Sequence, residues 1–127
     1  PEKQYEYAFT FLRNQEYDKA EKALQEFVAK NKGNDLAGNA QFWLGETYYV
    51  QKKYTEAAVA YAEGMQKYPK NAKAADNLLK LGMALGQLNK KTEACTAFGQ
   101  LNKKFPTAAA SIKRRVEAEQ RRLNCPS

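Results

Sequence analysis

Histidine is absent from this sequence of 127 residues, and cysteine occurs only twice. Without histidine the chain lacks the commonest general base and the commonest metal ligand of proteins. Neither a Ser-His nor a Cys-His nucleophile can be assembled within it, and two cysteines alone cannot complete a structural zinc site of the usual kind. No glycine-rich phosphate loop is present. We therefore expect a protein that is not an enzyme and that uses no metal or other cofactor.

Long apolar runs are also missing. No stretch of about 18 apolar residues exists, so we expect no insertion into a membrane, and no signal peptide is visible. Because the sequence starts at Pro1 without a methionine, we expect a fragment or a processed product of a longer protein. The other prolines, at 69, 106 and 126, leave the middle of every periodic apolar stretch uninterrupted.

Basic residues exceed acidic ones by 21 to 14, which gives a net charge of +7. Such a charge is typical of proteins that bind nucleic acid or an anionic surface. The other interpretation is that the basic residues simply form the solvated exterior of the helices. Most basic residues are spread along the chain, and the exceptions gather near its end at Lys113, Arg114, Arg115, Arg121 and Arg122. No nucleic-acid-binding motif accompanies them, so we expect no nucleic acid partner.

An internal repeat of 37 residues organises the sequence. The middle unit contains Leu44-Gly45-x2-Tyr48, then Ala57-x3-Tyr61, then Pro69. The third unit contains Leu81-Gly82-x2-Leu85, Ala94-x3-Phe98 and Pro106, and the first contains Tyr7-Ala8-x2-Phe11 and Ala20-x3-Leu24. Apolar residues recur three and four apart in each unit, which indicates two helices per repeat.

The spacing predicts helices over residues 2–13, 16–30, 35–50, 53–67, 71–87, 90–104 and 108–123. Small residues at 8, 45 and 82 are predicted to lie where the two helices of a hairpin approach most closely, and Leu24, Tyr61 and Phe98 to insert into the neighbouring hairpin. Neither helix of a unit can bury its apolar face alone, so stacking forms the core. The last segment has Ile112, Val116 and Leu123 on one side and arginines and glutamates on the other, which is typical of a closing helix.

The pattern resembles the tetratricopeptide repeat, Leu-Gly-x2-Tyr, then Ala-x3-Phe, then Pro, over essentially the whole chain. Gln41 stands where tryptophan is usual, Lys32 stands where the first unit should have proline, and the period is 37 residues rather than about 34. We expect the extra residues to lengthen the first helix of each hairpin by about one turn. The predicted fold class is all-α: a right-handed superhelical stack of three tetratricopeptide-like hairpins with a C-terminal capping helix, seven helices in all. We expect one domain over 1–127, with repeats at about 1–34, 35–70 and 71–106 and a capping helix at 107–124.

Two segments carry a narrower resemblance. They read Asn-Ala-Gln-Phe-Trp-Leu-Gly-Glu-Thr-Tyr-Tyr over 39–49, and Tyr-Pro-Lys-Asn-Ala-Lys-Ala-Ala-Asp over 68–76 followed by Leu-Leu-Lys-Leu-Gly over 78–82. With Arg-Arg-Leu-Asn at 121–124, they are similar to the C-terminal domain of the Tol-Pal system proteins of Gram-negative bacteria, the YbgF/CpoB family of cell division coordinators. The resemblance implies a periplasmic scaffold that follows a trimerising coiled coil in the parent protein. It implies TolA as a partner, and a role in coordinating outer-membrane constriction with septal peptidoglycan synthesis.

The first helices of successive hairpins line the concave face of such stacks. By helical phase, the residues expected to point into this groove are Tyr5, Phe9, Leu12, Asn39, Phe42, Glu46, Tyr49, Asp76, Leu79 and Met83. Aromatic and methionine side chains bury area at modest entropic cost, so we expect a peptide or helix of a protein partner to bind there. The other interpretation is that several of them are ordinary core residues. Trp43 is expected to pack within the stack.

The periplasmic location that the resemblance implies bears on Cys95 and Cys125. In an oxidising compartment two cysteines of a small chain can form a disulfide, which here would attach the closing helix to the stack. The alternative is a buried thiol at Cys95 and a free thiol at Cys125.

Two other functions stay open at this point. One is the repeat domain of an outer-membrane assembly or pilus-biogenesis lipoprotein, and the other is a binder of an anionic polymer through the basic surface. A chaperone-type carboxylate clamp is not expected, because the first helix has Tyr5 and Phe9 where such a clamp needs lysine and asparagine.

Overall fold

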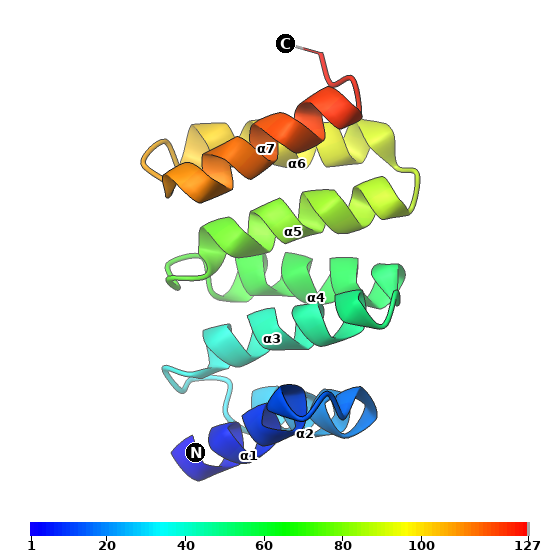
Figure 1. Ribbon diagram of the computed structural model, residues 1–127. Coiled ribbons are helices and arrows are strands. Elements are labelled where there is room, and N and C mark those ends of the chain that lie inside the picture. Colours follow the sequence, from blue (N-terminus) through cyan, green and yellow to red (C-terminus); the bar gives the residue numbers. More distant parts are fainter. Residues whose placement is uncertain (127) are drawn as a thin grey trace.

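Seven α-helices are found in the computed structural model, which describes residues 1–126. They are α1 (Glu2–Arg13), α2 (Tyr17–Lys30), α3 (Ala37–Val50), α4 (Tyr54–Lys67), α5 (Ala74–Gln87), α6 (Lys91–Lys104) and α7 (Ala110–Arg122). The first six pair as three hairpins that stack in chain order, and α7 closes the end of the stack (Figure 1). The predicted all-α stack of hairpins is therefore confirmed. Within residues 1–126 no helix is long and apolar enough to cross a membrane.

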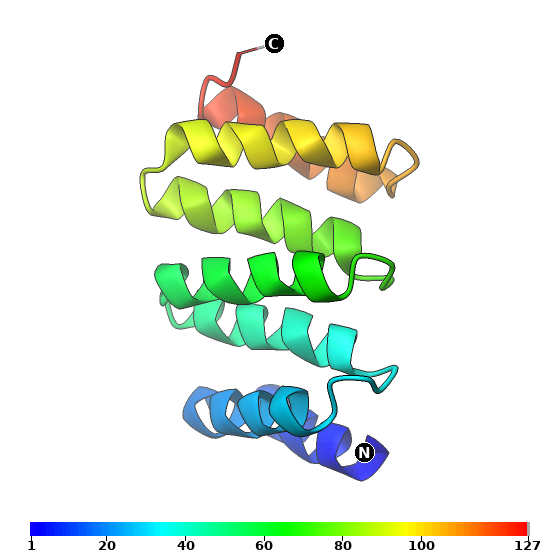
Figure 2. The ribbon, with the colours of Figure 1, turned by 180° about the vertical axis from the view of Figure 1, so that it is seen from behind.

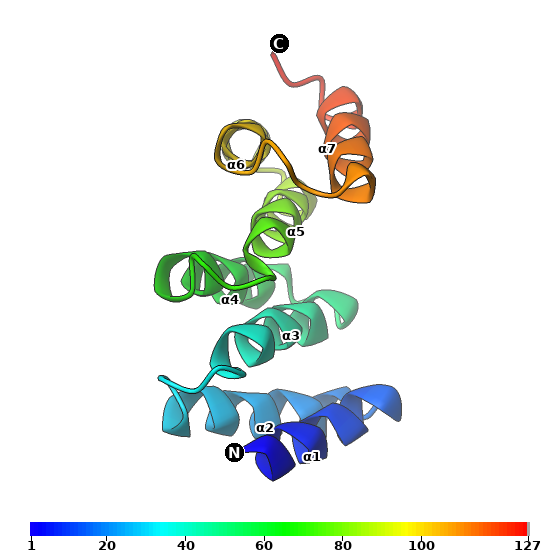
Figure 3. The same cartoon turned by 90° about the vertical axis from the view of Figure 1, so that its left-hand side faces the viewer.

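The hairpins are arranged so that the stack has two sides. Seen from behind, α2, α4 and α6 lie in front of their hairpin partners (Figure 2). A quarter turn shows α3, α5 and α7 on one side and α4 and α6 on the other (Figure 3). We call the side formed by α1, α3 and α5 the first-helix side. It brings together residues that are 37 positions apart in the sequence.

Each hairpin turn depends on one residue in the left-handed backbone region. These residues are Gln15 (φ 59°), Lys52 (φ 63°) and Asn89 (φ 61°), which are spaced by the repeat length. In the middle turn the N–H of Lys53 donates to the carbonyl of Tyr48 at 2.9 Å, which satisfies an acceptor left free at the end of α3. The same reversal in every repeat gives all three hairpins the same geometry.

The connections between hairpins are longer, and they correct two of the predictions. The Asn71 side-chain oxygen accepts the N–H of Lys73 at 2.8 Å, and that of Asn34 accepts the N–H of Leu36 at 2.9 Å. These turns compete with helix, so α5 begins at residue 74 rather than 71 and α3 at 37 rather than 35. The extra residues of the repeat therefore lie in the connections. They do not lengthen the first helices, since α3 and α4 have 14 residues each.

A glycine beneath an aromatic ring forms the centre of two hairpins. A Cβ atom at Gly45 would lie 2.5 Å from Cε1 of Tyr61, and one at Gly82 would lie 2.5 Å from Cε1 of Phe98. Both rings are fully buried. The prediction that these rings insert into the neighbouring hairpin was incomplete, because each ring first covers the glycine of its own hairpin. In the first hairpin Leu24 stands at the position equivalent to Tyr61, and Ala8 stands at the position equivalent to Gly45.

Size complementarity also joins one hairpin to the next. Phe27 of α2 shares a buried cluster with Ala40 of α3. At the next junction the equivalent positions are Gly64 on α4 and Asn77 on α5, so the small residue is now on the second helix of the hairpin. The side chain of Asn77 lies on Gly64, where an added Cβ would be 2.8 Å from its Oδ1. A large residue thus faces a small one at both junctions, which keeps the spacing of the hairpins similar.

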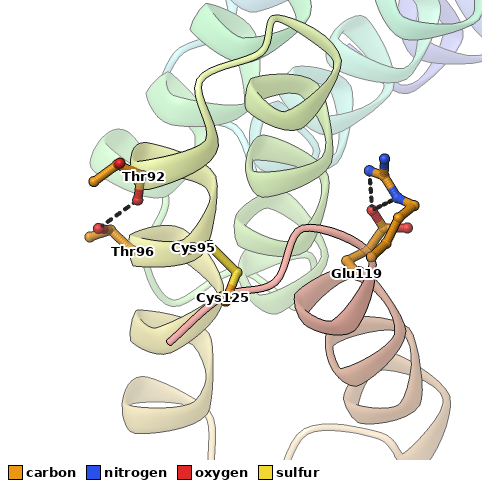
Figure 4. Close-up of a disulfide and its surroundings, with 6 residues drawn as sticks. Thr92, Cys95, Thr96, Glu119 and Cys125 are labelled. Carbon is orange, nitrogen blue, oxygen red and sulfur yellow. Dashed lines mark hydrogen bonds and ion pairs between the residues drawn. A yellow bond between two sulfur atoms is a disulfide. The ribbon is translucent and has the colours of Figure 1, made fainter. Parts of the chain in front are cut away.

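The closing helix α7 packs on α5 and α6 through a smaller interface than joins any two consecutive helices of α1–α6. Val116 is fully buried in this interface, with Ile112 and Leu123 half-buried beside it, as predicted. A disulfide joins Cys95 of α6 to Cys125, with the Cα atoms 5.5 Å apart (Figure 4). Asn124 turns the chain toward α6 with a φ of 55°. The pairing that the resemblance implied is therefore present in the structure.

Glu119 of α7 corrects the prediction that the glutamates of this helix lie on its solvated side. The residue is only 8% exposed. Its carboxylate accepts hydrogen bonds from Arg122 Nη2 at 2.7 Å and from Arg115 Nε at 3.3 Å. A buried carboxylate is tolerated when it is paired and hydrogen-bonded in this way.

Replacing Gly45 by alanine should destabilise the protein, because the new methyl group would overlap the ring of Tyr61. We expect the free energy of unfolding in urea to fall by about 1–3 kcal/mol. Gly99 is the matched control, since it also lies within a helix but has no atom within 4 Å of an added Cβ. Gly99→Ala should raise stability by about 0.5–1 kcal/mol through helix propensity alone. Equal effects of the two substitutions would contradict the proposed packing.

Removing the disulfide should loosen α7 before the rest of the fold. The bond closes a loop of 30 residues, so Cys95→Ser with Cys125→Ser should lower the unfolding free energy by about 3–4 kcal/mol in the chain-entropy model. Hydrogen exchange should show the amides of α7 losing protection while those of α3 and α4 keep it. Uniform loss of protection across all helices would contradict this order of opening.

Candidate partner-binding surface

Aromatic rings lie side by side along the first-helix side, across the junction of the first two hairpins. Tyr5 and Phe9 of α1 have ring centroids 6.0 Å apart, and Phe9 meets Trp43 of α3 edge-on at 5.3 Å. Trp43 in turn contacts Phe42 at 5.2 Å. Such edge-to-face pairs stabilise each other beyond their buried area. The contact between Phe9 and Trp43 therefore joins aromatic rings of two separate repeats into one surface.

Three cations lie over aromatic rings of α1 and α3. One of them, Lys80, belongs to α5 and so extends the surface to that helix. The Arg13 guanidinium is 5.9 Å from the centroid of Phe9. The Nζ atom of Lys73 is 5.2 Å from Phe42 and 5.4 Å from Trp43, and that of Lys80 is 5.3 Å from Tyr49. These distances are within the range of cation–π attraction. We call this set the aromatic–cation row: Phe9, Phe42, Trp43 and Tyr49 with Arg13, Lys73 and Lys80.

Glu46 is the acidic centre of the first-helix side. Its carboxylate lies 3.5 Å from Lys80 Nζ and accepts a hydrogen bond from the hydroxyl of Tyr61. Burial raises the pKa of Tyr61 far above its ordinary value, and the negative charge of Glu46 raises this pKa further. The hydroxyl therefore remains a proton donor at all physiological pH values. The hydroxyl of Tyr61 and the ammonium of Lys80 therefore both hold the carboxylate in place. Through these contacts Glu46 links the core of the second hairpin to α5.

Two tyrosines of this surface are half-buried, which leaves part of each ring free for a partner. Burial raises the pKa of Tyr5, with an opposing contribution from Trp43, and burial also raises the pKa of Tyr49. The ring of Tyr49 packs edge-on against Tyr54 at 5.2 Å. Both phenols stay neutral, so they present apolar faces and one hydroxyl each rather than a charge.

The structure divides the predicted groove residues into two groups. Seven of them are half-buried and remain accessible: Tyr5, Phe9, Leu12, Asn39, Glu46, Tyr49 and Asp76. Phe42, Leu79 and Met83 are only 4%, 6% and 6% exposed, so they belong to the core, and the prediction that they line an open groove is corrected. Leu79 and Met83 share a cluster with Val116 of α7, which covers this part of α5.

Four residues of the surface were missed or misplaced by reasoning from the sequence. Trp43 is half-buried and contacts both α1 and the connection before α5, whereas it was expected inside the stack. The three cations of the row were not expected to take part in the surface. The repeat did carry a signal, because Lys80 lies 37 residues after Trp43 and so occupies the same position of the next first helix.

The chemistry of this surface is that of binding. Aromatic faces, aliphatic side chains and a few fixed charges can bury a partner's side chains and orient them. Within residues 1–126 there is no group of three or more metal-ligating His, Cys, Asp or Glu side chains. The row has no nucleophile activated by a neighbouring base, which covalent catalysis requires.

Comparisons with known proteins agree with the repeat. Models of the tetratricopeptide repeat match residues 9–72 and residues 76–108. A segment of 42 residues is 43% identical to cell division coordinators CpoB of Pseudomonas putida, one of them from strain KT2440. This match spans 33% of the present chain and 16% of each relative, so the likeness to these proteins concerns a small part of their length.

The single tryptophan of the chain reports on the aromatic–cation row. Phe9→Ala removes a ring that covers one edge of Trp43, so the fluorescence of Trp43 should shift to longer wavelength. We expect a loss of about 1–2 kcal/mol in stability, below the roughly 3–5 kcal/mol typical of a fully buried phenylalanine. Phe11→Ala is the control, because Phe11 contacts Tyr7 and Lys19 instead. A shift in the control and none in Phe9→Ala would refute the arrangement.

Proposed function

The chain belongs to the tetratricopeptide repeat family, and we propose that it is a non-enzymatic scaffold that binds a partner protein on its first-helix side. The observation that carries this proposal is the aromatic–cation row. Packing of the hairpins joins the half-buried rings of Phe9, Trp43 and Tyr49 to cations from α5 and its preceding connection. Aromatic and arginine side chains are enriched where proteins bind each other. A partner segment lying across the hairpins would contact all three repeats at once.

The partner that we propose is the periplasmic part of TolA, with the chain working in the Tol-Pal system of a Gram-negative bacterium. The resemblance of residues 39–49, 68–76 and 78–82 to the Tol-Pal family supports this assignment. So does the likeness of one segment to proteins named cell division coordinators. The disulfide between Cys95 and Cys125 supports a periplasmic location, since such bonds persist in oxidising compartments.

The role in the cell that follows is coordination of outer-membrane constriction with septal peptidoglycan synthesis during division. In this role the domain would hold TolA and the septal synthesis machinery near each other, without chemistry of its own. The parent protein would carry several such domains if it is trimeric through a coiled coil, and that would raise the avidity for clustered partners.

Binding of an anionic polymer is less well supported by the surface charges. Arg115 and Arg122 pair with Glu119, and Arg121 lies 3.7 Å from Glu117. Three of the four arginines on α7 are therefore already engaged by carboxylates of the same helix, and two of these three share Glu119. Specific recognition of a protein by the aromatic–cation row accounts better for the arrangement of the aromatic rings.

Calorimetric titration with the periplasmic part of TolA from the same organism tests the proposal. Tyr49→Ala with Lys73→Ala removes one ring and one cation of the row, and we expect the affinity to fall by about tenfold or more, which corresponds to about 1.4 kcal/mol. Val59→Ala is the matched control, because Val59 is 54% exposed but lies on α4, outside the first-helix side. It should leave the affinity unchanged.

Three results would count against this proposal in different ways. Binding that survives the double substitution would keep TolA as the partner and move the site away from the row. Absence of binding at about 100 μM protein would favour the repeat domain of an assembly or pilus-biogenesis lipoprotein. Affinity that falls steeply with salt, by the same amount for polyphosphate and for TolA, would favour the anionic-polymer binder.

A further inference from the structure

A groove lies between α2 and α4, on the side of the stack that the second helices of the hairpins form. Figure 2 shows these two helices running in the same direction, with α3 between them. The groove has a volume of about 430 Å³ and is lined by residues of α2, α3 and α4. All three helices lie inside the stack, so a further repeat at either end of the stack would pack beyond the groove. None of its lining residues belongs to the aromatic–cation row.

The surface inside the groove is mainly apolar. Leu44 and Ala60 are buried at its base, Val28 is half-buried, and Val59 is 54% exposed. Gln41 also lines the groove, but its amide is engaged, because Nε2 donates to the carbonyl of Ala60 at 2.9 Å. A ligand in the groove would therefore bury apolar surface, which is the main driving force of association.

The repeat indicates what keeps this groove open. Position 28 of α2 is equivalent to position 65 of α4, which lies 37 residues later, and Met65 stands there. Met65 is half-buried and packs against the core cluster that contains Leu78 and Leu101. Val28 has a shorter side chain than Met65, and space remains between α2 and α4. We therefore expect a methionine at position 28 to fill the groove without disturbing the fold.

Two contacts hold the groove at a fixed width. Near the start of α2 and α4, Glu21 pairs at 3.0 Å with Lys53, which directly precedes α4. Near the ends of the two helices, the hydroxyl of Tyr68 donates to the carbonyl of Lys32 at 3.1 Å. The groove is therefore formed before a ligand arrives, and a preformed site loses little free energy to reorganisation on binding.

Charges of opposite sign lie at the two ends of the groove. Lys32 follows the end of α2, and Glu56 lies in the first turn of α4. Both residues are exposed, and neither forms an ion pair within residues 1–126. Lys67 lies at the same end as Lys32, but it pairs with Glu63 at 3.4 Å. A complementary ligand has an acidic group near Lys32 and a basic group near Glu56.

We propose that this groove binds an amphipathic helix of a partner protein, antiparallel to α2 and α4. The helix dipole favours acidic residues in the first turn of a helix and basic residues in its last turn. Such a helix meets both charges when its first turn lies at Lys32 and its last turn at Glu56. Its apolar stripe then lies on Val28 and Val59. The site uses no residue of the aromatic–cation row, so it goes beyond the proposed function.

Two other occupants match the groove less well. A fatty acid has one negative group, which would meet Lys32 but leave Glu56 without a partner. A second copy of the chain would have to offer a helix with a free apolar stripe, whereas the stripes of α2, α4 and α6 are buried within the stack. The net charge of +7 on each copy also opposes their association. The charges and the apolar surface together favour a helix from a different protein.

The probe is a lactam-stapled peptide with the sequence of α2, residues 17–30, titrated into the isotope-labelled chain. This peptide has Asp18 in its first turn, Lys30 in its last turn and one apolar face. We expect saturable NMR shifts at the methyl groups of Val28 and Val59. A second peptide exchanges the two charges, with Asp18→Lys and Lys30→Asp, and should bind about tenfold more weakly because like charges then meet at both ends of the groove.

Three variants of the chain complete the test. Val28→Met should fill the groove and weaken binding of the first peptide by about tenfold or more, with circular dichroism still helical. Val50→Met is the matched control, because Val50 is 52% exposed and does not line the groove, and it should bind like the parent chain. Lys32→Glu with Glu56→Lys reverses the charges of the groove, so it should prefer the charge-exchanged peptide.

Several outcomes would overturn the proposal. They are an absence of saturable shifts with both peptides, shifts that avoid α2 and α4, and equal affinities of the two peptides for the parent chain. Oleate that shifts the methyl groups of Val28 and Val59, when neither peptide does so, would overturn it in favour of a lipid. A concentration-dependent dimer in sedimentation, abolished by Val28→Met, would overturn it in favour of a second copy.

Discussion

The close approach of two helices over a glycine is the constraint on which the rest of this structure depends. Tyr61 covers Gly45, and Phe98 covers Gly82, at distances that leave no room for a Cβ atom. The ring on the second helix fixes how far the first helix lies from it, and the left-handed turn residue fixes the reversal between them. The second and third hairpins share this pair, the first has Ala8 and Leu24 at the same positions, and the first helices of the three hairpins therefore lie in register. The aromatic–cation row is a consequence of that stacking.

Much of the fold could be predicted from the sequence, because the residues that recur in each repeat are those that pack between helices. A small residue and a large residue recur at a constant phase, and only close helix–helix contact requires such a pair at every repeat. The presence and the order of the helices follow from the spacing of the apolar residues. The helix starts at residues 37 and 74 could not be located in this way. They depend on hydrogen bonds that the side-chain oxygens of Asn34 and Asn71 accept from backbone N–H groups, and apolar periodicity does not reveal such bonds.

The candidate site was less predictable, for a physical reason. Helical phase gives the direction in which a side chain points, but not what lies opposite it. Leu79 and Met83 were expected to line the groove, but α7 packs across them, and the position of α7 depends on long-range contacts and on the bond at Cys125. Burial of Glu119 is tolerated for a different, local reason, because two arginines of its own helix pair with its carboxylate.

The central claim is that stacking turns separate repeats into one binding surface on the first-helix side. The most direct test is an NMR map of the labelled domain during titration with the periplasmic part of TolA. The account predicts that the largest shifts fall on α1, α3 and α5 and include the indole of Trp43, because these elements form the aromatic–cation row. Shifts confined to α2, α4 and α6, with the indole signal unmoved, would contradict it.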